Sequence, residues 1–465
     1  MALSSRTVLT GAASSAAVLG LAGCNGLSKS PTTSNGGGGG GGTSASPGAS
    51  STGGSTAGSG GGSKPVSLEF LNWSSLKTDP EYLGFQKVIE AFHAANPDIT
   101  VTQKAVPYTS VATTVHARLQ ANTPPDLFRV SYIDIGLYSS KGVLYDLSST
   151  FSPAEVKEFI PAFWSGVSYQ GKPYGVPHQT DTTAIAYRKD AMAAAGITRL
   201  PTTVADAWTW EEFAANSAKL KKTITAKNRY PFAYDWQQAG AYRWLTWLYE
   251  AGGSMLDSSL KKATLDSPEG LAALKYTKDF FTQGWVPKNT SVKSTTYTDT
   301  AFIAGTVAMS FIGDFLVSEI ATGVKFDWGI MPQPKGKTAS SDLGGNAVVA
   351  TKGGKNPEAA AKFLKFLASA PQMEMFCAMT NELPTRVALT KADIPFATSK
   401  PLMKVFVEQA TTLTAPQVAE VTVPAFGQIN TILANGLESV FVSGADPKSA
   451  LSSMDDKITK AISAP

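Results

Sequence analysis

The chain has 465 residues, of which 43% are hydrophobic and 16% are charged. At about 150 residues per domain, this length allows two or three domains, and the apolar content excludes a wholly disordered protein. The formal net charge is only +4, and no long run of Lys and Arg forms a basic stripe. We therefore expect a folded protein without a nucleic-acid partner.

The amino terminus has the features of an export signal. Arg6 precedes apolar and small residues from 8 to 22, a run too short and too rich in Gly, Ser and Ala for a membrane span. The run ends in Leu21-Ala22-Gly23-Cys24, which resembles the bacterial lipoprotein signal. We predict a signal peptide over residues 1–23 that directs the chain into general secretion and is then cleaved. The resemblance further implies a lipid anchor on Cys24. The alternative is an ordinary secretory peptide with an incidental cysteine.

A flexible tether is expected between the anchor and the folded part. From Cys24 to residue 64 the chain is mostly Gly, Ser, Thr, Ala and Pro, with almost no large apolar side chains. Such a segment cannot bury a core and would span about 35 Å end to end. The folded part then begins near Val66 and retains one cysteine, Cys377, so no intramolecular disulfide forms. The hydrophobic neighbours of Cys377 predict a buried, unreactive thiol.

The first elements of the folded part alternate between strand and helix. Alternating residues predict a strand over 66–72, and helical spacing of apolar residues predicts a helix over 81–95. A second strand at 99–103, a helix over about 109–121 and a strand ending at Val130 follow. This order predicts a parallel sheet with helices on both faces, and hence an α/β fold.

Ligands of such sheets bind beyond the carboxyl ends of the strands. Trp73 and Ser74 follow the first strand, and Arg129, Ser131, Tyr132 and Asp134 lie at the end of the third. These strand ends therefore supply candidates for ligand contact. For Trp73 the alternative is core or hinge packing, and for Asp134 it is a helix N-cap.

Later positions are predicted to be structural. Thr209-Trp-Glu-Glu212 is a capping box, and Ser267-Pro268 and Asn356-Pro357 each place a capping residue before a first-turn proline. A helix follows over 359–367, and the last third of the chain is expected to be mostly helical. Asp126 is expected to bond backbone donors at a turn. Tyr242, Leu245 and Tyr249 have helical spacing, so we expect them to form one face of a helix that packs in the core.

Several segments in sequence order, spanning about residues 66–390, resemble the extracellular solute-binding proteins of ABC importers, the group that includes maltose-binding protein. They are Phe92-His-Ala-Ala-Asn-Pro-Asp-Ile-Thr-Val101, Pro125-Asp-Leu-Phe128, Lys141-Gly-Val-Leu-Tyr-Asp-Leu147, Gly171-Lys-Pro-Tyr-Gly-Val-Pro177, Tyr187-Arg-Lys-Asp190, Ala195-Gly-Ile197, Thr209-Trp-Glu-Glu-Phe213, Phe302-Ile-Ala-Gly-Thr-Val-Ala-Met309, Gly313-Asp-Phe315, Gly344-Gly345 and Glu382-Leu-Pro-Thr-Arg386. The sequence departs from the family at two positions: Arg188 stands where the family usually has Asn, and Phe315 where it commonly has Trp. These departures affect the expected ligand contacts and leave the expected fold unchanged.

The resemblance implies a two-lobed α/β fold of the periplasmic-binding-protein type II over residues 66–465, with a hinge and a ligand cleft between the lobes. One lobe would hold about 66–177 and 344–395, and the other about 178–343 and 396–465. The ligand would close the lobes by hinge motion.

A carbohydrate cleft needs planar polar side chains for hydroxyls and aromatic rings for the apolar C–H faces. On that chemistry, and on the positions that the resemblance implies, the expected ligand-binding residues are Trp73, Ser74, Arg129, Tyr132, Asp134, His178, Gln179, Asp181, Trp236, Gln237, Asp314, Phe315, Gly345 and Asn346. His178 has the alternative of a hydrogen-bonded structural histidine.

Other functions are less well supported by the sequence. No hydrolase or phosphate-loop motif occurs, and the three histidines are not at metal-ligand spacing, so we expect no enzyme, metal or cofactor. Asp134, Asp181 and Asp314 would also suit a cationic solute such as a polyamine, and a surface adhesin without a small ligand stays open. The sequence favours a monomeric lipoprotein, held outside the cytoplasm, that delivers a mono- or oligosaccharide to an ABC permease.

Overall fold

The computed structural model describes residues 65–464 apart from 75, 235–239, 289, 291 and 295–296. All of the described residues belong to the unit Gly62–Pro465. Among them, no helix combines the length and the apolar character needed to cross a bilayer. The predictions for Cys24, the signal peptide, the tether, Trp236 and Gln237 concern residues outside this description.

The first sheet is built around the three predicted parallel strands. Strands β1 (Val66–Trp73), β2 (Ile99–Val106) and β3 (Leu127–Ser131) are parallel, in the order β2-β1-β3. Two later strands, β11 (Asn346–Ala350) and β6 (Gly175–Val176), extend the sheet in antiparallel pairing. The strand predictions are confirmed, and the sheet is mixed because the chain returns to it after residue 345.

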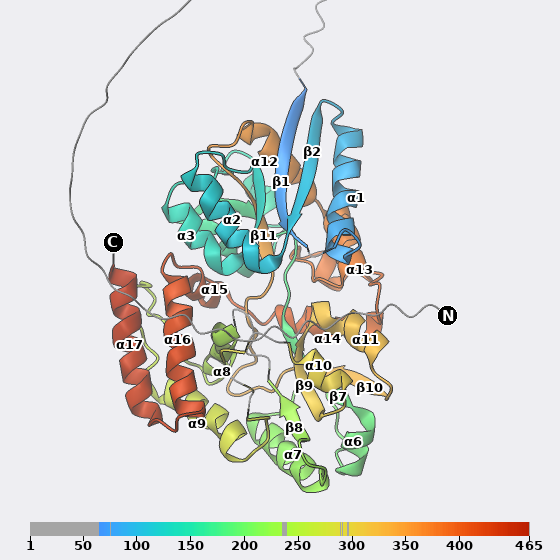
Figure 1. The fold of residues 1–465 in the computed structure, drawn as a ribbon, viewed down its shortest axis with the longest axis vertical. Coiled ribbons are helices and arrows are strands. Elements are labelled where there is room, and N and C mark those ends of the chain that lie inside the picture. Colours follow the sequence, from blue (N-terminus) through green and yellow to red (C-terminus); the bar gives the residue numbers. More distant parts are fainter. Residues whose placement is uncertain are drawn as a thin grey trace, which may run out of the picture. The chain divides into compact units, whose positions relative to one another are not determined.

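Helices cover both faces of this sheet, as Figure 1 shows. On one side lie α1 (Pro80–Ala95) and α13 (Ala370–Thr380), and on the other lies α2 (Tyr108–Gln120). The apolar stripe of α1 packs into an aromatic core in which the rings of Phe70 and Phe85 meet edge to face at 5.0 Å. Both predicted helices are therefore present, and they orient the strand ends that follow.

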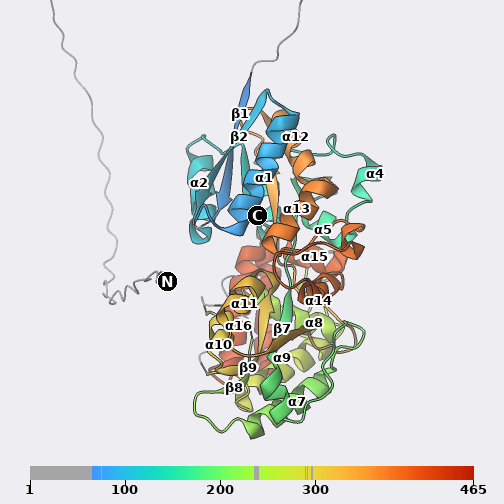
Figure 2. The same cartoon turned by 90° about the vertical axis from the view of Figure 1, so that its right-hand side faces the viewer.

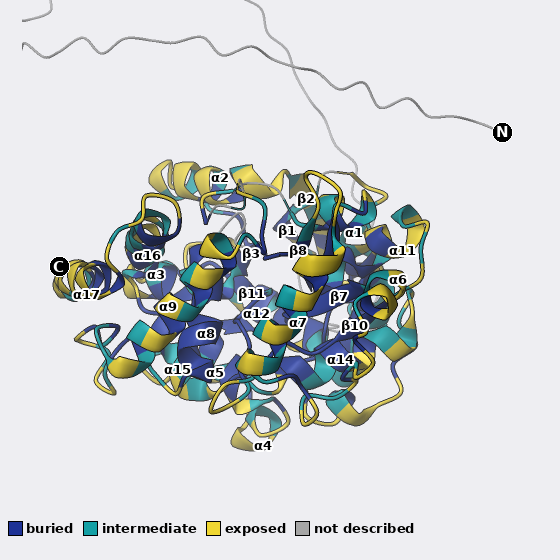
Figure 3. Cartoon of the chain, turned by 90° about the horizontal axis from the view of Figure 1, so that it is seen from below, coloured by how far each residue is buried: buried dark blue, intermediate teal, exposed yellow. Residues whose placement is uncertain are grey.

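A second sheet has the order β10-β7-β9-β8. Its strands are β7 (Thr183–Arg188), β8 (Tyr230–Ala233), β9 (Val307–Gly313) and β10 (Trp328–Met331). Strand β9 is buried along its whole length, antiparallel to β7 and parallel to β8. In Figure 3, β7 and β10 are mostly dark blue, whereas α7 and α9 show yellow and teal on their outer surfaces. Burial on both faces accounts for the mainly apolar sequence of residues 307–312, which Ser310 alone interrupts.

Aromatic residues fill the core beside the second sheet. Trp247 is fully buried and lies within 6.5 Å, ring centre to ring centre, of Phe213, Phe280 and Phe311. The stripe of Tyr242, Leu245 and Tyr249 is buried as predicted. This aromatic-rich segment therefore belongs mainly to the core.

The last third is helical, as expected, and it is tied to both sheets. Helix α14 (Lys400–Ala410) packs on β7 and β10, whereas α15 (Ala415–Val421) packs on α5 (Pro161–Gly166), which Figure 2 shows beside it. Helices α16 (Phe426–Phe441) and α17 (Pro447–Ser463) pack on each other. The remaining elements are η1 (Tyr132–Asp134), α3 (Ile135–Ser140), α4 (Pro153–Val156), β4 (Ser168–Tyr169), β5 (Lys172–Pro173), α6 (Lys189–Ala194), α7 (Trp210–Thr223), η2 (Gly240–Trp244), α8 (Leu245–Glu250), α9 (Pro268–Thr282), α10 (Asp299–Ile303), η3 (Asp314–Leu316), α11 (Val317–Gly323), α12 (Pro357–Leu367) and η4 (Leu389–Lys391).

Local predictions are confirmed with one exception. The capping box at Thr209 and the Ser267 cap are present, and Asp126 accepts hydrogen bonds from the backbone of Glu69 and Lys355. Asn356 does not cap α12 with its side chain, because its backbone (φ −145°, ψ 74°) differs from the extended conformation usual at that position. Cys377 is free and buried.

Residues 178–183 and 340–345 carry the chain between the two sheets, and both they and residues 381–386 lie where these passages meet and are bonded there. Thr180 and Leu383 exchange two backbone hydrogen bonds of 2.9 Å. The hydroxyl of Thr180 also donates to the Gly344 carbonyl at 3.1 Å, and the hydroxyls of Thr182 and Ser341 are bonded. We call residues 178–183, 340–345 and 381–386 the crossing segments.

Candidate functional site

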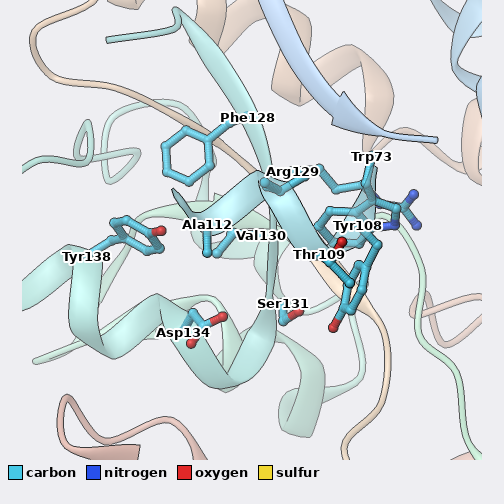
Figure 4. Close-up of a pocket in the computed structure, with 11 residues that line it drawn as sticks. Trp73, Tyr108, Thr109, Ala112, Phe128, Arg129, Val130, Ser131, Asp134 and Tyr138 are labelled. Atoms are coloured by element: carbon cyan, nitrogen blue, oxygen red, sulfur yellow. The ribbon is translucent and has the colours of Figure 1, made fainter. Parts of the chain in front are cut away.

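A cavity of about 360 Å³ opens at the carboxyl ends of β1 and β3, where sheet topology predicts a ligand (Figure 4). Three predicted residues line it, namely Trp73, Arg129 and Asp134. The other lining residues come from β3, α2 and α3: Tyr108, Thr109, Val111, Ala112, Phe128, Val130, Ser131 and Tyr138. The cavity is therefore mainly apolar, with a few polar groups.

Trp73 is held by its neighbours. The Arg129 guanidinium lies 4.1 Å from the centre of the Trp73 ring, and the Tyr108 ring meets it at 86° with centres 5.3 Å apart. Tyr108 keeps 43% of its surface exposed. Tyr108 is thus an accessible ring of this cavity, which our sequence analysis missed. Tyr108 follows Pro107 at the carboxyl end of β2, and this position at a strand end could have identified it as a candidate for ligand contact.

Arg129 is fully buried and its charge is compensated internally. Its Nε donates to Asn346 Oδ1 and its Nη2 donates to Glu81. Strands β3 and β11 are adjacent, which places Asn346 next to the base of Arg129. Both predicted residues are thereby engaged within the fold, where they hold the cavity wall.

Asp134 occupies the N-cap position of α3, as the structural alternative expected, but its side chain makes no capping hydrogen bond. Its carboxyl is half-buried, and no hydrogen bond joins it to another of the described residues. Burial raises its pKa to about 6. This carboxyl is consequently available to a ligand in the cavity.

Ser74 and Tyr132 lie outside the cavity lining. The Ser74 hydroxyl is 2.7 Å from both the Leu76 carbonyl and Asp79 Oδ2. The Tyr132 hydroxyl donates to the Gln179 carbonyl at 2.6 Å and is buried. Tyr132 therefore connects the first sheet to a crossing segment.

His178 and Gln179 are fully buried in the same crossing segment. The His178 ring lies 5.2 Å from both Phe85 and Phe376, and neither of its nitrogens bonds another described residue. Burial, together with the Arg129 charge, lowers its pKa well below the usual value. The expectation of a hydrogen-bonded histidine is wrong, because aromatic packing holds the ring instead.

Buried carboxyl groups gather where the crossing segments meet β9. Asp314 accepts a hydrogen bond of 2.8 Å from the Thr182 backbone through Oδ1. Within the described part of the chain, Asp314 Oδ2, Asp181 Oδ1 and Glu382 Oε2 are buried without a partner. Burial raises the pKa of all three groups, to about 6 for Asp181, and repulsion from neighbouring carboxylates adds to the rise. Such unpaired acceptors are costly unless a ligand or proton satisfies them.

Arg243 and Arg129 supply positive charge near this group, Arg243 to Asp181 and Arg129 to Glu382. Arg243 forms a buried ion pair with Asp342, whose Oδ1 also accepts from the Thr183 hydroxyl at 3.0 Å. The Arg243 charge opposes the rise in the pKa of Asp181. The ion pair fixes one crossing segment to η2, and the Thr183 hydrogen bond joins the same segment to the start of β7.

Two further predicted residues have distinct surroundings. Gly345 has φ +85°, and a Cβ there would lie 2.6 Å from Thr180 Cα, so its contact is with the neighbouring crossing segment. Phe315 is half-buried and packs edge to face on Tyr297 at 5.5 Å. Among the residues that the structure describes, no group of three His, Cys, Asp or Glu side chains is arranged to hold a metal ion.

The family is decided by a match of residues 77–374 to the model of the bacterial extracellular solute-binding proteins. The chain belongs to this family. A putative binding protein of Brucella abortus is 25% identical over 385 residues, which are 81% of this chain and 88% of the relative. The maltodextrin-binding protein of Bacillus subtilis is 27% identical over 58% of this chain and 63% of its own length.

Solved structures show the fold of this extracellular solute-binding protein. The sugar-binding protein MalE from Xanthomonas citri superposes with a TM-score of 0.71 at 20% identity, covering 85% of this chain and 97% of that one. The predicted two-lobed α/β architecture of the type II periplasmic-binding proteins is confirmed. The protein belongs to an ABC-transporter family that binds solutes outside the cytoplasm rather than to an enzyme family.

Proposed function

We propose that this solute-binding protein captures a carbohydrate between its lobes and delivers it to an ABC permease. The observation that carries the proposal is an accessible aromatic ring, Tyr108, in the same cavity as the available carboxyl of Asp134. Aromatic faces accept the C–H surface of a sugar, and carboxyl oxygens accept its hydroxyl protons. The resemblance to a protein named for binding maltodextrin supports the same ligand class.

The proposed ligand contacts come from both lobes. Trp73 and Asp134 would contribute from the first sheet, and Asp181, Asp314 and Phe315 from the crossing segments and the end of β9. The unpartnered buried oxygens of Asp181 and Asp314 support this assignment, because a sugar hydroxyl would satisfy them. The remaining candidates, Ser74, Arg129, Tyr132, His178, Gln179, Gly345 and Asn346, would position these groups, and Trp236 and Gln237 remain predicted contacts.

Capture requires that the ligand favour one arrangement of the lobes. A sugar that contacts both lobes binds the closed arrangement better than the open one and so shifts the population toward closure. We infer that lobe 1 comprises about 66–177 and 344–395 and lobe 2 about 178–343 and 396–465. The hydrogen bonds among the crossing segments support a hinge there.

We also propose that a lipid on Cys24 anchors the protein and that residues 25–64 tether a monomeric binding domain to the membrane. The sequence ending in Leu21-Ala22-Gly23-Cys24 supports this. Cys24→Ser should release the protein from the membrane fraction of the producing cells into the soluble fraction, without change in ligand binding. Retention of the Cys24→Ser protein in the membrane fraction would contradict the lipid anchor.

A second candidate is a cationic solute, favoured by the surplus of buried carboxyl groups at the crossing segments. A thermal-shift screen of the full chain against neutral sugars, polyols and polyamines separates the two. A ligand at 100 times its dissociation constant stabilises the fold by about 2.7 kcal/mol, so the true class gives a clear shift. Shifts with polyamines and none with sugars would overturn the carbohydrate proposal.

The contacts are tested by substitution once a ligand is known. Trp73→Ala and Asp181→Ala should each weaken binding tenfold or more, about 1.4 kcal/mol. Glu90→Ala, an exposed change on α1, is the matched control and should bind as the parent does. Unchanged affinity in a folded Asp181→Ala protein would remove Asp181 from the site.

A further inference from the structure

The cavity of Figure 4 contains an isolated carboxyl group among aromatic rings. Asp134 shares the lining with Tyr108, Tyr138, Phe128 and Trp73. Among the described residues, no Lys, Arg or His lies within 4.0 Å of it as an ion-pair partner, and no donor caps it. A carboxylate in such surroundings lacks the compensation that buried charges usually have.

The charged and titratable groups that face Asp134 do not supply that compensation. Tyr108 on α2 and Tyr138 on α3 are hydroxyls whose pKa the Asp134 charge raises further. His116 is exposed and packs on the far ring, Tyr138, at 5.5 Å between centres.

Arg129, the cation of β3, is directed away from Asp134 and engaged through two of its three guanidinium nitrogens, Nε and Nη2. It is bonded to Glu81 and to Asn346, and it lies over Trp73. In Figure 4 its guanidinium lies beside Trp73 and Tyr108, across the cavity from Asp134. The Asp134 side of the cavity therefore combines one negative charge with aromatic walls.

That combination suits an organic cation of small size. An ammonium group pairs with the carboxylate and is also attracted by the electron-rich faces of tyrosine rings. A neutral hydroxyl would make a hydrogen bond there but would leave the negative charge uncompensated. Resting on the proposed function, we propose that this cavity binds the protonated amine of an amino sugar, so that the preferred carbohydrate is basic rather than neutral.

The affinity for an amino sugar should depend on pH through two groups, the Asp134 carboxyl and the amine of the sugar. Burial raises the pKa of Asp134 to about 6, so the carboxyl becomes ionised as the pH rises through about 6. The amine must stay protonated, so affinity falls again when the pH passes the pKa of the amine. Affinity for the amino sugar should therefore rise between pH 5 and pH 7, whereas affinity for its neutral parent should stay nearly constant.

The test measures calorimetric affinities of the full chain for matched pairs: glucosamine and glucose, galactosamine and galactose, and the chitosan trisaccharide and cellotriose. At pH 7 we expect the amino member of at least one pair to bind tenfold or more tightly than its parent. Asp134→Asn should abolish this preference. Asp456→Asn, which removes an exposed charge on α17 outside the cavity, is the matched control and should retain it.

The outcomes of this test distinguish the amino-sugar inference from the broader proposal that the protein binds a carbohydrate. If neutral sugars bind as tightly as amino sugars, or if the preference survives Asp134→Asn, the amino-sugar inference is wrong and the carbohydrate proposal stands. If Asp134→Asn does not fold, the pH profile of the unmodified chain decides, and equal profiles for both members overturn the inference. If polyamines bind and no sugar of either kind does, both proposals fail.

Discussion

Gly345→Ala is expected to destabilise the protein through both its backbone conformation and a steric clash. Gly345 has φ +85°, a conformation that costs an L-residue about 1–2 kcal/mol. An added Cβ would also lie 2.6 Å from Thr180 Cα and 2.9 Å from the Asp181 nitrogen, which are backbone atoms of the adjacent crossing segment. Forcing these segments apart adds the cost of overpacking, about 1–3 kcal/mol. Together the substitution should lower the free energy of unfolding by about 2–5 kcal/mol.

Gly142→Ala provides the matched control. Gly142 has φ +65°, yet a Cβ there would meet nothing within 4 Å. This control therefore carries only the conformational cost of about 1–2 kcal/mol. Urea unfolding followed by tryptophan fluorescence measures both variants, and a shifted midpoint at constant slope reports stability alone.

The difference between the two variants isolates the close approach of the crossing segments. We expect Gly345→Ala to lose at least about 1 kcal/mol more than Gly142→Ala. Because Thr180 and Asp181 would be displaced, Gly345→Ala should also weaken ligand binding, whereas Gly142→Ala should not. Equal losses of stability in the two variants would refute the reasoning that the crossing segments are tightly packed at Gly345.

Other predictions concern buried charges and the free thiol. Asp342→Ala should lower the free energy of unfolding by about 3–5 kcal/mol, because it breaks the buried ion pair with Arg243 by removing its carboxylate. Glu90→Ala, which breaks an exposed pair, should cost under about 1 kcal/mol. Similar losses for both variants in urea would contradict this. Burial raises the pKa of Glu420 from 4.5 to about 7, so the folded protein binds this proton more tightly than the unfolded chain. Stability measured across pH should fall by up to about 3 kcal/mol between pH 4.5 and 7, and a rise would refute the assignment. Cys377 should react with a thiol reagent only after unfolding, since it is fully buried; rapid reaction of the folded protein would disprove its burial.

The elements that arise from local patterns could be predicted from the sequence. Polar and apolar residues alternate in the strand over Val66–Trp73, and the apolar residues around Tyr242 have helical spacing. In both segments the local spacing is enough to predict which residues are buried. The cap at Thr209 likewise depends on a residue three positions away. Short-range rules of this kind suffice for the order of elements and for the edge of the sheet at which the cavity lies.

The arrangement inside the site could not be predicted, because it depends on distant partners. Arg129 is bonded to Glu81, 48 positions away, and to Asn346, 217 positions away. Because of those bonds, Arg129 forms part of the cavity wall instead of a free ligand contact. Tyr108, which the sequence did not single out, is an accessible ring of the cavity. No local signal indicates that His178 lies between two phenylalanine rings contributed by α1 and α13.

The central claim is that a carbohydrate binds between the lobes and closes them. The most direct measurement is the distance between spin labels on exposed positions of the two lobes, with Lys141→Cys and Lys222→Cys introduced into the Cys24→Ser chain. Buried Cys377 should stay unlabelled. The account predicts a shorter distance when the sugar identified by thermal shift saturates the protein, and no change with a sugar that gives no shift. Binding of the sugar with an unchanged distance between the labels would contradict it.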